Sequence, residues 1–380
     1  MEKQQVENPF LIKGYQDASH FCDREEEMQR LLANANDGAD TTVISPRRMG
    51  KTGLIHRFFD QMNNDHRFET IYTDIYPARS LQDFTQLMAE AILKKFPEKS
   101  TIGEKFLAFL KGFRPLISFD TITGEPQVQL LYQTASEKEY TLQALFQFLN
   151  EQKTKIVFAI DEFQQISEFP EKNMETLLRT YTQHLNNIRF IYCGSKKAMM
   201  TDIFSNAKRP FYGTTRFLYL DKIDADKYTP FIREKFNSCG KRIDDESLNF
   251  ILDWSKRHTF YTQSLCNVVF RLSNEEITPD IVKLACADLL TSYEPVFFQY
   301  RNLLTPAQWN FLIAVAKEDE VRQPTAQRFI MDYRIGTPAN ARRLLNALIE
   351  KELILETVTK RDKVYRVYDL FFSRWLQSEY

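Results

Sequence analysis

The sequence predicts an α/β fold for residues 1–222, built on a parallel, doubly wound sheet, and two smaller units after it. Two observations support this prediction. Short β-prone segments alternate with helical segments up to residue 220, and this order builds a parallel sheet with helices on both faces. One of the strands, Lys155–Ile160, is an unbroken apolar run after a charged start, which is typical of a strand buried on both faces.

Periodicity and capping signals place the elements of this first unit. An irregular segment, residues 8–21, precedes a helix whose acidic first turn begins at Asp23 and which ends near Asn34, because carboxylates stabilise a helix N-terminus. Ser80 is the expected N-cap of a helix through Phe96. The other predicted elements are the strands Thr41–Ile44, Thr70–Tyr76, Lys155–Ile160, Arg189–Ser195 and Arg216–Leu220, and the helices Gly53–Phe59, Thr141–Gln152 and Glu171–Leu185.

A β-hairpin is expected near residues 117–133, inserted between two helices of the first unit. The turn signal is Gly124-Glu125-Pro126, and alternating segments flank it at Ser118–Ile122 and Gln127–Leu130.

Two smaller units are expected at residues 223–300 and 301–380. From Asp224 to Pro295 the pattern is purely helical, which predicts a small helical lid. From Thr305 a helix, a short helix and a third helix precede two strands. Thr337 is the expected N-cap of the third helix, with Pro338 at its first position. This order is that of a winged helix, a variant of the helix-turn-helix.

The loop after the first strand carries a phosphate-binding motif. It reads Ser45-Pro46-Arg47-Arg48-Met49-Gly50-Lys51-Thr52, which is a P-loop with Ser45 where the pattern has its first glycine. Backbone N–H groups of the loop and of the following helix would face the phosphates. Gly50 permits close approach of the backbone, Lys51 reaches the outer phosphates, and the Thr52 hydroxyl suits Mg²⁺. The predicted nucleotide contacts are Ser45, Pro46, Arg47, Arg48, Met49, Gly50, Lys51, Thr52 and Gly53.

A pair of carboxylates follows the buried strand Lys155–Ile160. Ligands of α/β sheets bind at the carboxyl ends of the strands, and Asp161 and Glu162 lie at such an end. We expect Asp161 to bind Mg²⁺, directly or through water, and Glu162 to orient and polarise the attacking water. An alternative role, capping of the helix that follows, is compatible with this one. Both motifs together predict a P-loop nucleoside triphosphatase.

Composition narrows the class of protein. Apolar residues make up 43% and charged residues 27% of the 380 residues, as is usual for a soluble globular protein. Fifty basic and 51 acidic residues nearly cancel, so no global attraction to nucleic acid or membrane is implied. The five cysteines form no Cys-x-x-Cys pair, which disfavours a zinc site and a disulfide framework. The polar start and the absence of a long apolar run favour a cytoplasmic protein without a membrane segment.

The chain resembles the archaeal-type ATPases of the AAA+ and STAND lineage over nearly its whole length. Besides the P-loop, the resemblance depends on five segments. They are Asn8-Pro9-Phe10, Phe21-Cys22-Asp23-Arg24-Glu25, Ile160-Asp161-Glu162-Phe163-Gln164, Cys193-Gly194-Ser195 and the closing Asp369–Leu376. The resemblance also makes Phe211-Tyr212-Gly213 the segment before the last strand of the core.

This resemblance implies several roles. The Phe21–Glu25 segment, with Arg24, would cover an adenine, and Ser195 would be the polar residue near the γ-phosphate. Either Arg209 or Arg216 would act as an arginine finger on a neighbouring subunit, or simply pair with an acidic residue at the surface. The ligands implied are ATP and Mg²⁺. Lid residues Arg257-His258-Thr259 lie where related ATPases have Gly-x-Pro, and His258 is a candidate phosphate contact there.

The role of the third unit stays open between two hypotheses. In one, the winged helix binds DNA through Asn340, Arg343, Asn346 and Ala347, with Lys360, Arg361 and Lys363 on the wing. From Arg301 onward there are thirteen basic and ten acidic residues, which gives a net charge of +3 and only a mild positive bias. In the other, Arg342 and Arg343 belong to a solvated helix face, and the unit packs on the ATPase core or binds a protein partner or a second copy of the chain under the control of ATP.

Overall fold

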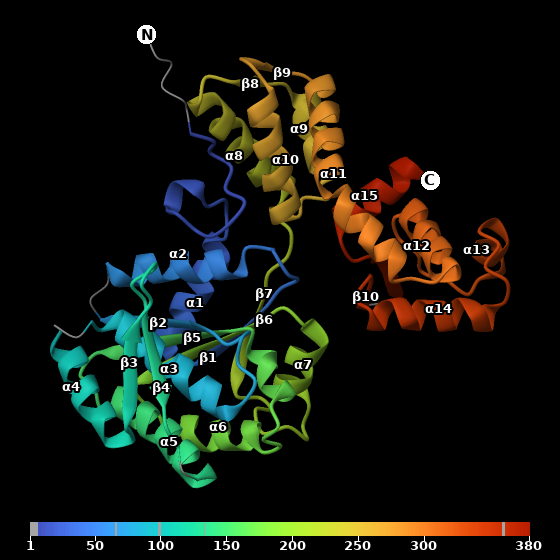
Figure 1. The fold of residues 1–380 in the computed structure, drawn as a ribbon. Coiled ribbons are helices and arrows are strands. Elements are labelled where there is room, and N and C mark those ends of the chain that lie inside the picture. Colours follow the sequence, from blue (N-terminus) through green and yellow to red (C-terminus); the bar gives the residue numbers. More distant parts are fainter. Residues whose placement is uncertain (1–6, 65–66, 98–99, 133, 359–361) are drawn as a thin grey trace. The chain divides into compact units, whose positions relative to one another are not determined.

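The computed structural model describes residues 7–64, 67–97, 100–132, 134–358 and 362–380. It divides into two compact units. Lys13–Ile223 form one unit, called here the ATPase unit, and Asp224–Tyr380 form the other together with the described part of Met1–Ile12. The helices and strands of both units are labelled in Figure 1. In the described residues no helix combines the length and apolar content needed to cross a bilayer.

A parallel five-stranded sheet forms the centre of the ATPase unit. Its strand order is β2-β5-β6-β1-β7, so one strand, β6, separates the strand before the P-loop from the strand that ends in Asp161. The strands are β1 Asp40–Ile44, β2 Phe68–Asp74, β5 Lys155–Asp161, β6 Ile188–Gly194 and β7 Thr215–Tyr219. The predicted α/β fold with a parallel, doubly wound sheet is confirmed.

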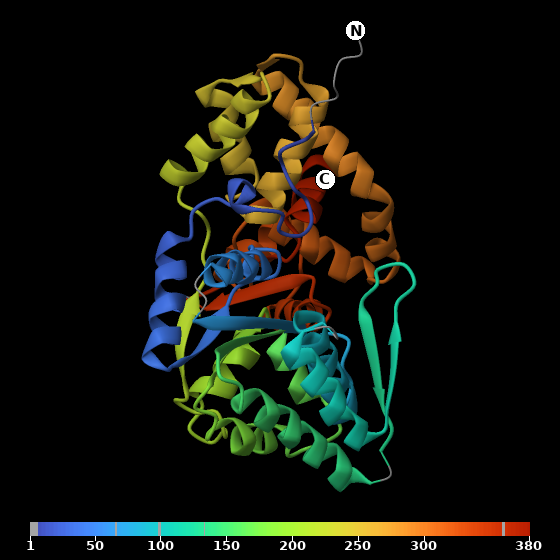
Figure 2. The same cartoon turned by 90° about the vertical axis from the view of Figure 1, so that its left-hand side faces the viewer.

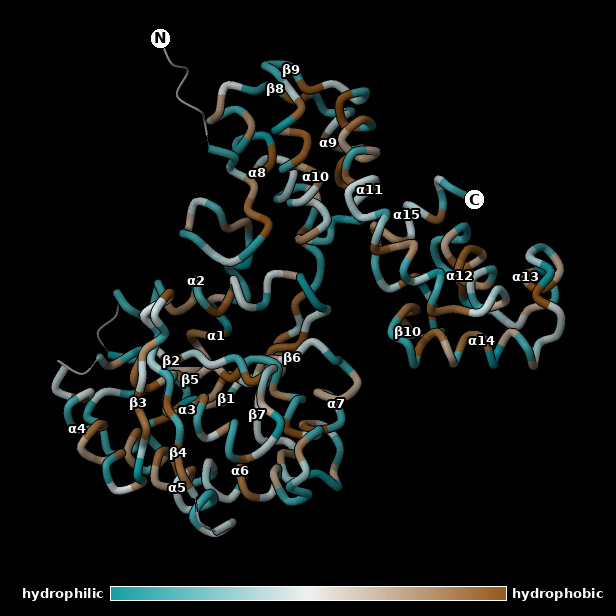
Figure 3. The backbone as a smooth tube through the Cα atoms, viewed as in Figure 1, coloured by the Kyte–Doolittle hydropathy of each residue, from teal (hydrophilic) through white to brown (hydrophobic). Residues whose placement is uncertain are grey.

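Helices cover both faces of this sheet because the strands expose apolar side chains on both. On one face α1 (Glu25–Asp37) and α2 (Lys51–Asn63) bury Leu31 and Phe58. The other face packs on α3 (Leu81–Lys95), α5 (Ala135–Asn150), α6 (Met174–Thr182) and α7 (Lys197–Ser205). Figure 3 colours the backbone by residue hydropathy, and hydrophobic residues, in brown, recur along the strands and helices of this unit. Short 3-10 helices lie at η1 (Ala18–His20), η2 (Lys111–Phe113) and η3 (Phe163–Glu168).

An antiparallel hairpin stands apart from the main sheet (Figure 2). Strands β3 (Pro115–Phe119) and β4 (Pro126–Leu130) follow α4 (Thr101–Leu110), and Gly124 takes a φ of 69° in the turn. Val128 and Leu130 anchor the hairpin in the core, because both are buried against the cluster that includes α3.

The second unit begins with a bundle of helices. They are α8 (Ala225–Ser238), α9 (Asp245–Trp254), α10 (Thr259–Leu272) and α11 (Pro279–Asn302). The pattern was expected to be purely helical, but two short strands, β8 (Arg242–Ile243) and β9 (Glu276–Ile277), pair in parallel. Two residues per strand are too few to produce a period-two signal in the sequence.

The winged helix follows in the predicted order. It comprises α12 (Pro306–Glu318), α13 (Gln327–Asp332), α14 (Pro338–Glu350), β10 (Ile354–Val358) and β11 (Lys363–Val367), and a closing helix α15 (Leu370–Glu379). Thr337 caps α14 as expected, since its side chain accepts the N–H of Asn340. Helix α15 packs on the lid, where the Tyr261 hydroxyl accepts the N–H of Leu370 at 3.1 Å.

Candidate functional site

The P-loop connects β1 to α2 as the sequence predicts. Gly50 is the N-cap of α2 with a φ of 91°, a left-handed conformation that glycine adopts without strain. Ser45 is 1% exposed, and its N–H donates to the carbonyl of Gly194. The residues with positive φ do not include Ser45. A serine is therefore tolerated at the position where the pattern has glycine.

Lys51 lies buried between the two carboxylates of the acidic pair. Its Nζ atom is 2.6 Å from Asp161 Oδ1 and 3.0 Å from Glu162 Oε1. Burial alone would lower the pKa of Lys51, but the negative charges of Asp161 and Glu162 raise it above the usual lysine value. Lys51 therefore stays a cation at the place where phosphate charge would be bound.

Asp161 also accepts hydrogen bonds from a second residue of α2 and from a residue of β2. The Thr52 hydroxyl donates to its Oδ2 atom at 2.8 Å, and the Tyr72 hydroxyl donates to the same atom at 3.1 Å. Burial raises the pKa of Asp161, yet the charge of Lys51 and the hydrogen bonds from Lys51, Thr52 and the Glu162 N–H leave it below its usual value. Thr52 and Asp161 thus place two hard oxygen donors side by side, the ligand type that Mg²⁺ prefers.

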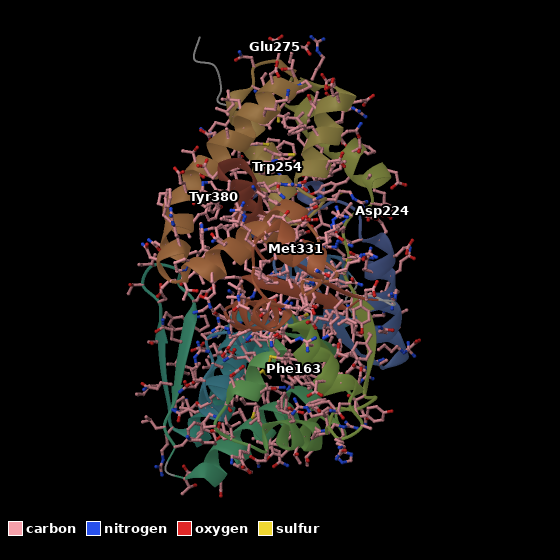
Figure 4. All side chains as sticks on the ribbon, turned by 90° about the vertical axis from the view of Figure 1, so that its right-hand side faces the viewer. Phe163, Asp224, Trp254, Glu275, Met331 and Tyr380 are labelled. Atoms are coloured by element: carbon pink, nitrogen blue, oxygen red, sulfur yellow. The ribbon has the colours of Figure 1, made fainter. Side chains whose placement is uncertain are left out.

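Glu162 begins the turn after β5 in a left-handed conformation, with a φ of 55°. Its Oε2 atom accepts hydrogen bonds from Ser195 at 2.7 Å and from Gln164. Behind it Phe163, labelled in Figure 4, is fully buried among Tyr192, Phe204 and Phe211. The core therefore fixes the backbone at Glu162, while the carboxylate of this residue accepts hydrogen bonds from Ser195 and Gln164.

The sheet explains why these residues meet. The parallel strands β1, β6 and β5 are neighbours, and Ile44 pairs with Gly194 while Ile160 pairs with Tyr192. Their carboxyl ends therefore lie along one edge of the sheet. The residues just beyond those ends are the P-loop, Ser195 and the acidic pair. Five of the predicted site residues come together in this way, namely Lys51, Thr52, Asp161, Glu162 and Ser195.

The remaining P-loop residues surround this group. Met49 is buried, while Pro46, Arg47 and Arg48 are exposed. A side chain at Gly53 would lie 3.5 Å from the ring of Phe21. The Phe21–Glu25 segment thus lies against the first turn of α2, next to the P-loop.

Three predicted arginines lie outside this group, namely Arg24, expected to cover the adenine, and Arg209 and Arg216, expected to reach the site of a neighbouring subunit. The Arg24 guanidinium is buried and bonds Glu27 and the carbonyl of Asp221 at 2.5 Å. Arg216 lies near the amino end of β7, paired in register with Thr41, and contacts Asp37 at 2.6 Å. Arg209 contacts Glu175 and Asp202. Each guanidinium has a local structural partner, and Arg216, whose side chain is 54% exposed, also faces solvent.

The sequence prediction missed three site residues. They are Tyr72 and Asp74 on β2, and Gln164, which follows the acidic pair. Asp74 is paired in register with Asp161, and burial raises its pKa. A polar residue at the end of the predicted strand Thr70–Tyr76 was the available signal, because that strand ends at the same edge of the sheet.

Two further predictions concern the second unit. In the lid, Arg257 lies 3.8 Å from Asp224, and His258 is the N-cap residue of α10. On α14, Arg342, Arg343 and Asn346 are exposed, whereas Asn340 and Ala347 are only partly so. Lys363 is exposed and bonds Glu356 at 2.8 Å. Lys360 and Arg361 lie outside the described residues.

This fold and this edge of the sheet define a P-loop ATPase with a winged helix. A family model described as an ATPase domain predominantly from Archaea matches residues 21–256, and the chain belongs to this family. A second model, described as a probable winged helix domain, matches residues 295–378. No curated protein matches the chain.

Several solved structures share the fold over nearly the whole chain. The Walker-type ATPase PABY2304 of Pyrococcus abyssi has a TM-score of 0.65 and 16% identity, with 97% of this chain and 99% of that chain covered. ORC1 of Aeropyrum pernix, solved in complex with DNA, has a TM-score of 0.51 and 12% identity, with 94% and 93% covered. ORC2 of the same organism, in ADPNP–ADP complexes, has a TM-score of 0.52, 12% identity and 93% of each chain covered.

Proposed function

We propose that this protein binds ATP with Mg²⁺ and hydrolyses it to ADP and phosphate. One observation carries the proposal, the convergence of Lys51, Thr52, Asp161, Glu162 and Ser195 at the carboxyl ends of β1, β5 and β6. The aromatic ring of Phe21 beside Gly53 supports a purine base next to the P-loop. The residues present fit the metal, because the Thr52 hydroxyl and the Asp161 carboxylate are oxygen ligands.

Each side chain has a distinct task in this proposal. Lys51, now paired with two carboxylates, would turn its ammonium group to the outer phosphates, whose negative charge replaces that of its present partners. Thr52 and Asp161 would hold Mg²⁺, which neutralises charge on the phosphate oxygens. Glu162 would orient a water molecule and accept its proton as the water oxygen bonds to the γ-phosphorus and the bond to ADP breaks.

The variant Glu162→Gln tests this assignment. Glutamine has nearly the same shape but cannot accept a proton, so ATP should still bind while turnover falls by roughly a hundredfold or more. Release of phosphate and binding of a fluorescent ATP analogue measure the two quantities separately. A control variant, Lys51→Ala, should lose nucleotide affinity as well. Turnover at the wild-type rate in Glu162→Gln would show that Glu162 is not the base.

We further propose that nucleotide state controls contact of the winged helix with duplex DNA. Arg342, Arg343 and Asn346 are exposed on α14, on the side away from its buried leucines. Positive side chains on this helix of a helix-turn-helix suit the major groove and its phosphates. ORC1, which has the same fold, was solved in complex with DNA.

The test is binding of a short DNA duplex at increasing salt, with ATP and with ADP. The double variant Arg342→Ala/Arg343→Ala should bind more weakly, and the slope of log affinity against log salt should fall by about one for each phosphate that is no longer neutralised. Arg242→Ala, an exposed arginine of the lid, is the matched control. If the wild type does not bind at low salt, about 50 mM, the winged helix is instead an arm for a protein partner or a second copy of the chain.

A neighbouring copy could also supply Arg209 or Arg216 as an arginine finger. Both arginines belong to ion pairs within the ATPase unit. Such a role would require those pairs to open on assembly, so it stays a prediction of the sequence.

A further inference from the structure

The carboxylate of Glu162 is held from both sides by three donors. Lys51 contacts its Oε1 atom at 3.0 Å, while Ser195 donates to Oε2 at 2.7 Å. The side-chain amide of Gln164 donates to the same Oε2 atom. Two of the donors are neutral, and both bind one oxygen. Oε2 is therefore bonded to two neutral side chains, and Oε1 is paired with the ammonium group of Lys51.

The side chain of Gln164 hydrogen-bonds Glu162 through its amide N–H group, while its oxygen has no such partner among the described residues. The residue is 4% exposed. That oxygen occupies the space that a side chain at Gly194 would need, because a Cβ atom there would lie 2.5 Å from it. A buried amide with an unsatisfied carbonyl costs free energy. The hydrogen bond from the amide to Glu162 offsets part of this cost.

We propose that Gln164 is a positioning residue that, together with Ser195, fixes the rotamer of Glu162. With Oε2 held, Oε1 is the oxygen left to face water when Lys51 turns to the phosphates. The inference deepens the proposed function and depends on it, since it assigns a role in the same hydrolysis. Gln164 acts through Glu162 and does not itself contact the reacting atoms.

The core holds the backbone of Glu162 in its left-handed conformation but does not fix the direction of the carboxylate. A non-glycine residue at a φ of 55° is held there by its surroundings, and Phe163 in the core supplies that restraint for the backbone. The carboxylate itself extends beyond the core, so its direction depends on its hydrogen bonds. Without Gln164 the Oε2 atom keeps one neutral donor, Ser195, about which the carboxylate can rotate.

The variant Gln164→Met tests the proposal, because methionine has a similar volume but no amide. We expect kcat for ATP hydrolysis to fall roughly ten- to a hundredfold, by analogy with the loss when a residue that orients a metal ligand is removed. The dissociation constant of an ATP analogue and the melting temperature should stay near the wild-type values. Gln165→Met is the matched control. The neighbouring Gln165 donates to the carbonyl of Ala78 instead, and its variant should keep wild-type kcat.

A second variant covers the case in which methionine disturbs the core. Gln164→Glu keeps the shape but sets a negative charge against Glu162, so kcat should fall at least as far as in Gln164→Met when both are assayed above neutral pH. Wild-type kcat in both variants would overturn the proposal. A parallel loss of analogue binding and melting temperature in both would also overturn it, since Gln164 would then be structural. These results remain distinct from a failure of the proposed function, in which the wild type itself would not hydrolyse ATP.

Discussion

At the scale of single residues, the site is a set of buried charges that compensate one another. Lys51 and Asp161 are both more than nine-tenths buried, and their side chains are 2.6 Å apart. A buried ion pair adds little net stability, but removal of one partner leaves an uncompensated charge and costs about 3–5 kcal/mol. The pair therefore suits binding better than folding, because the phosphates of a nucleotide can replace the carboxylates as partners of Lys51.

Asp40, at the start of β1, is a partly buried carboxylate of a different kind. Burial raises its pKa to about 6, although a hydrogen bond from the Phe190 N–H and the nearby Arg189 oppose the shift. In the unfolded chain an aspartate has a pKa of about 3.9. Between these values the folded protein binds more protons than the unfolded one, so the free energy of unfolding should fall as pH rises from about 4 to 6.

The variant Asp40→Asn should remove this dependence. Asparagine stays neutral and keeps an oxygen for the Phe190 N–H. Its free energy of unfolding should exceed that of the wild type by a margin that grows from about pH 4 to 6 and then levels off at no more than about 3 kcal/mol. Urea unfolding at several pH values across and above this range measures the margin. A constant difference over this range would mean that Asp40 titrates normally in the folded protein.

At the scale of helices and strands, local sequence patterns were sufficient for most of the fold. The P-loop, the apolar strand before Asp161 and the capped helix after Thr337 all carry their signals within a few residues. The family resemblance placed Ser195 near the γ-phosphate, but the contacts of Tyr72 with Asp161 and of Ser195 with Glu162 are not encoded within a few residues. They depend on the strand order β2-β5-β6, which brings residues 89 and 33 positions away in the chain to one carboxylate pair.

Arginine positions show the same limit. Arg24 follows the family pattern in sequence, yet its guanidinium ties the start of α1 to the carbonyl of Asp221. Strand register puts Arg216 beside Thr41, where it pairs with Asp37 of its own chain, a partner that its neighbours in sequence do not indicate. A long cation can bond any acceptor within its reach, so its partner is set by tertiary structure and not by its neighbours in sequence.

At the scale of the whole molecule, the chain passes between the two units twice, after Ile12 and after Ile223. The lid and the winged helix share one unit, because α11 runs on through Asn302 and Phe371 of α15 packs on Tyr261 of the lid with ring centroids 4.7 Å apart. Any displacement of the lid on nucleotide binding would therefore carry the winged helix with it.

The N-terminal segment belongs to this same second unit. Two hydrogen bonds join this segment to α10. The side-chain amide of Asn8 donates to the backbone carbonyl of Asn267 at 3.0 Å, and the side-chain amide of Asn267 donates to the backbone carbonyl of Phe10 at 2.8 Å. Phe10 is 1% exposed, and its ring centroid lies 4.6 Å from that of Phe236 on α8.

The variant Phe10→Ala should accordingly destabilise the second unit and leave the sheet of the ATPase unit unchanged. Loss of a buried phenyl ring costs about 3–5 kcal/mol, so amides of α8 and α10 should exchange with solvent faster, while those of β1, β5 and β6 keep wild-type protection. Ile12→Ala is the control, because Ile12 is 45% exposed and loss of its side chain should change stability by about 0.5 kcal/mol or less. Hydrogen exchange read by mass spectrometry resolves these segments. Equal acceleration in both units would show that Phe10 supports the whole molecule, whereas no change in α8 would show that the N-terminal segment is not part of the second unit.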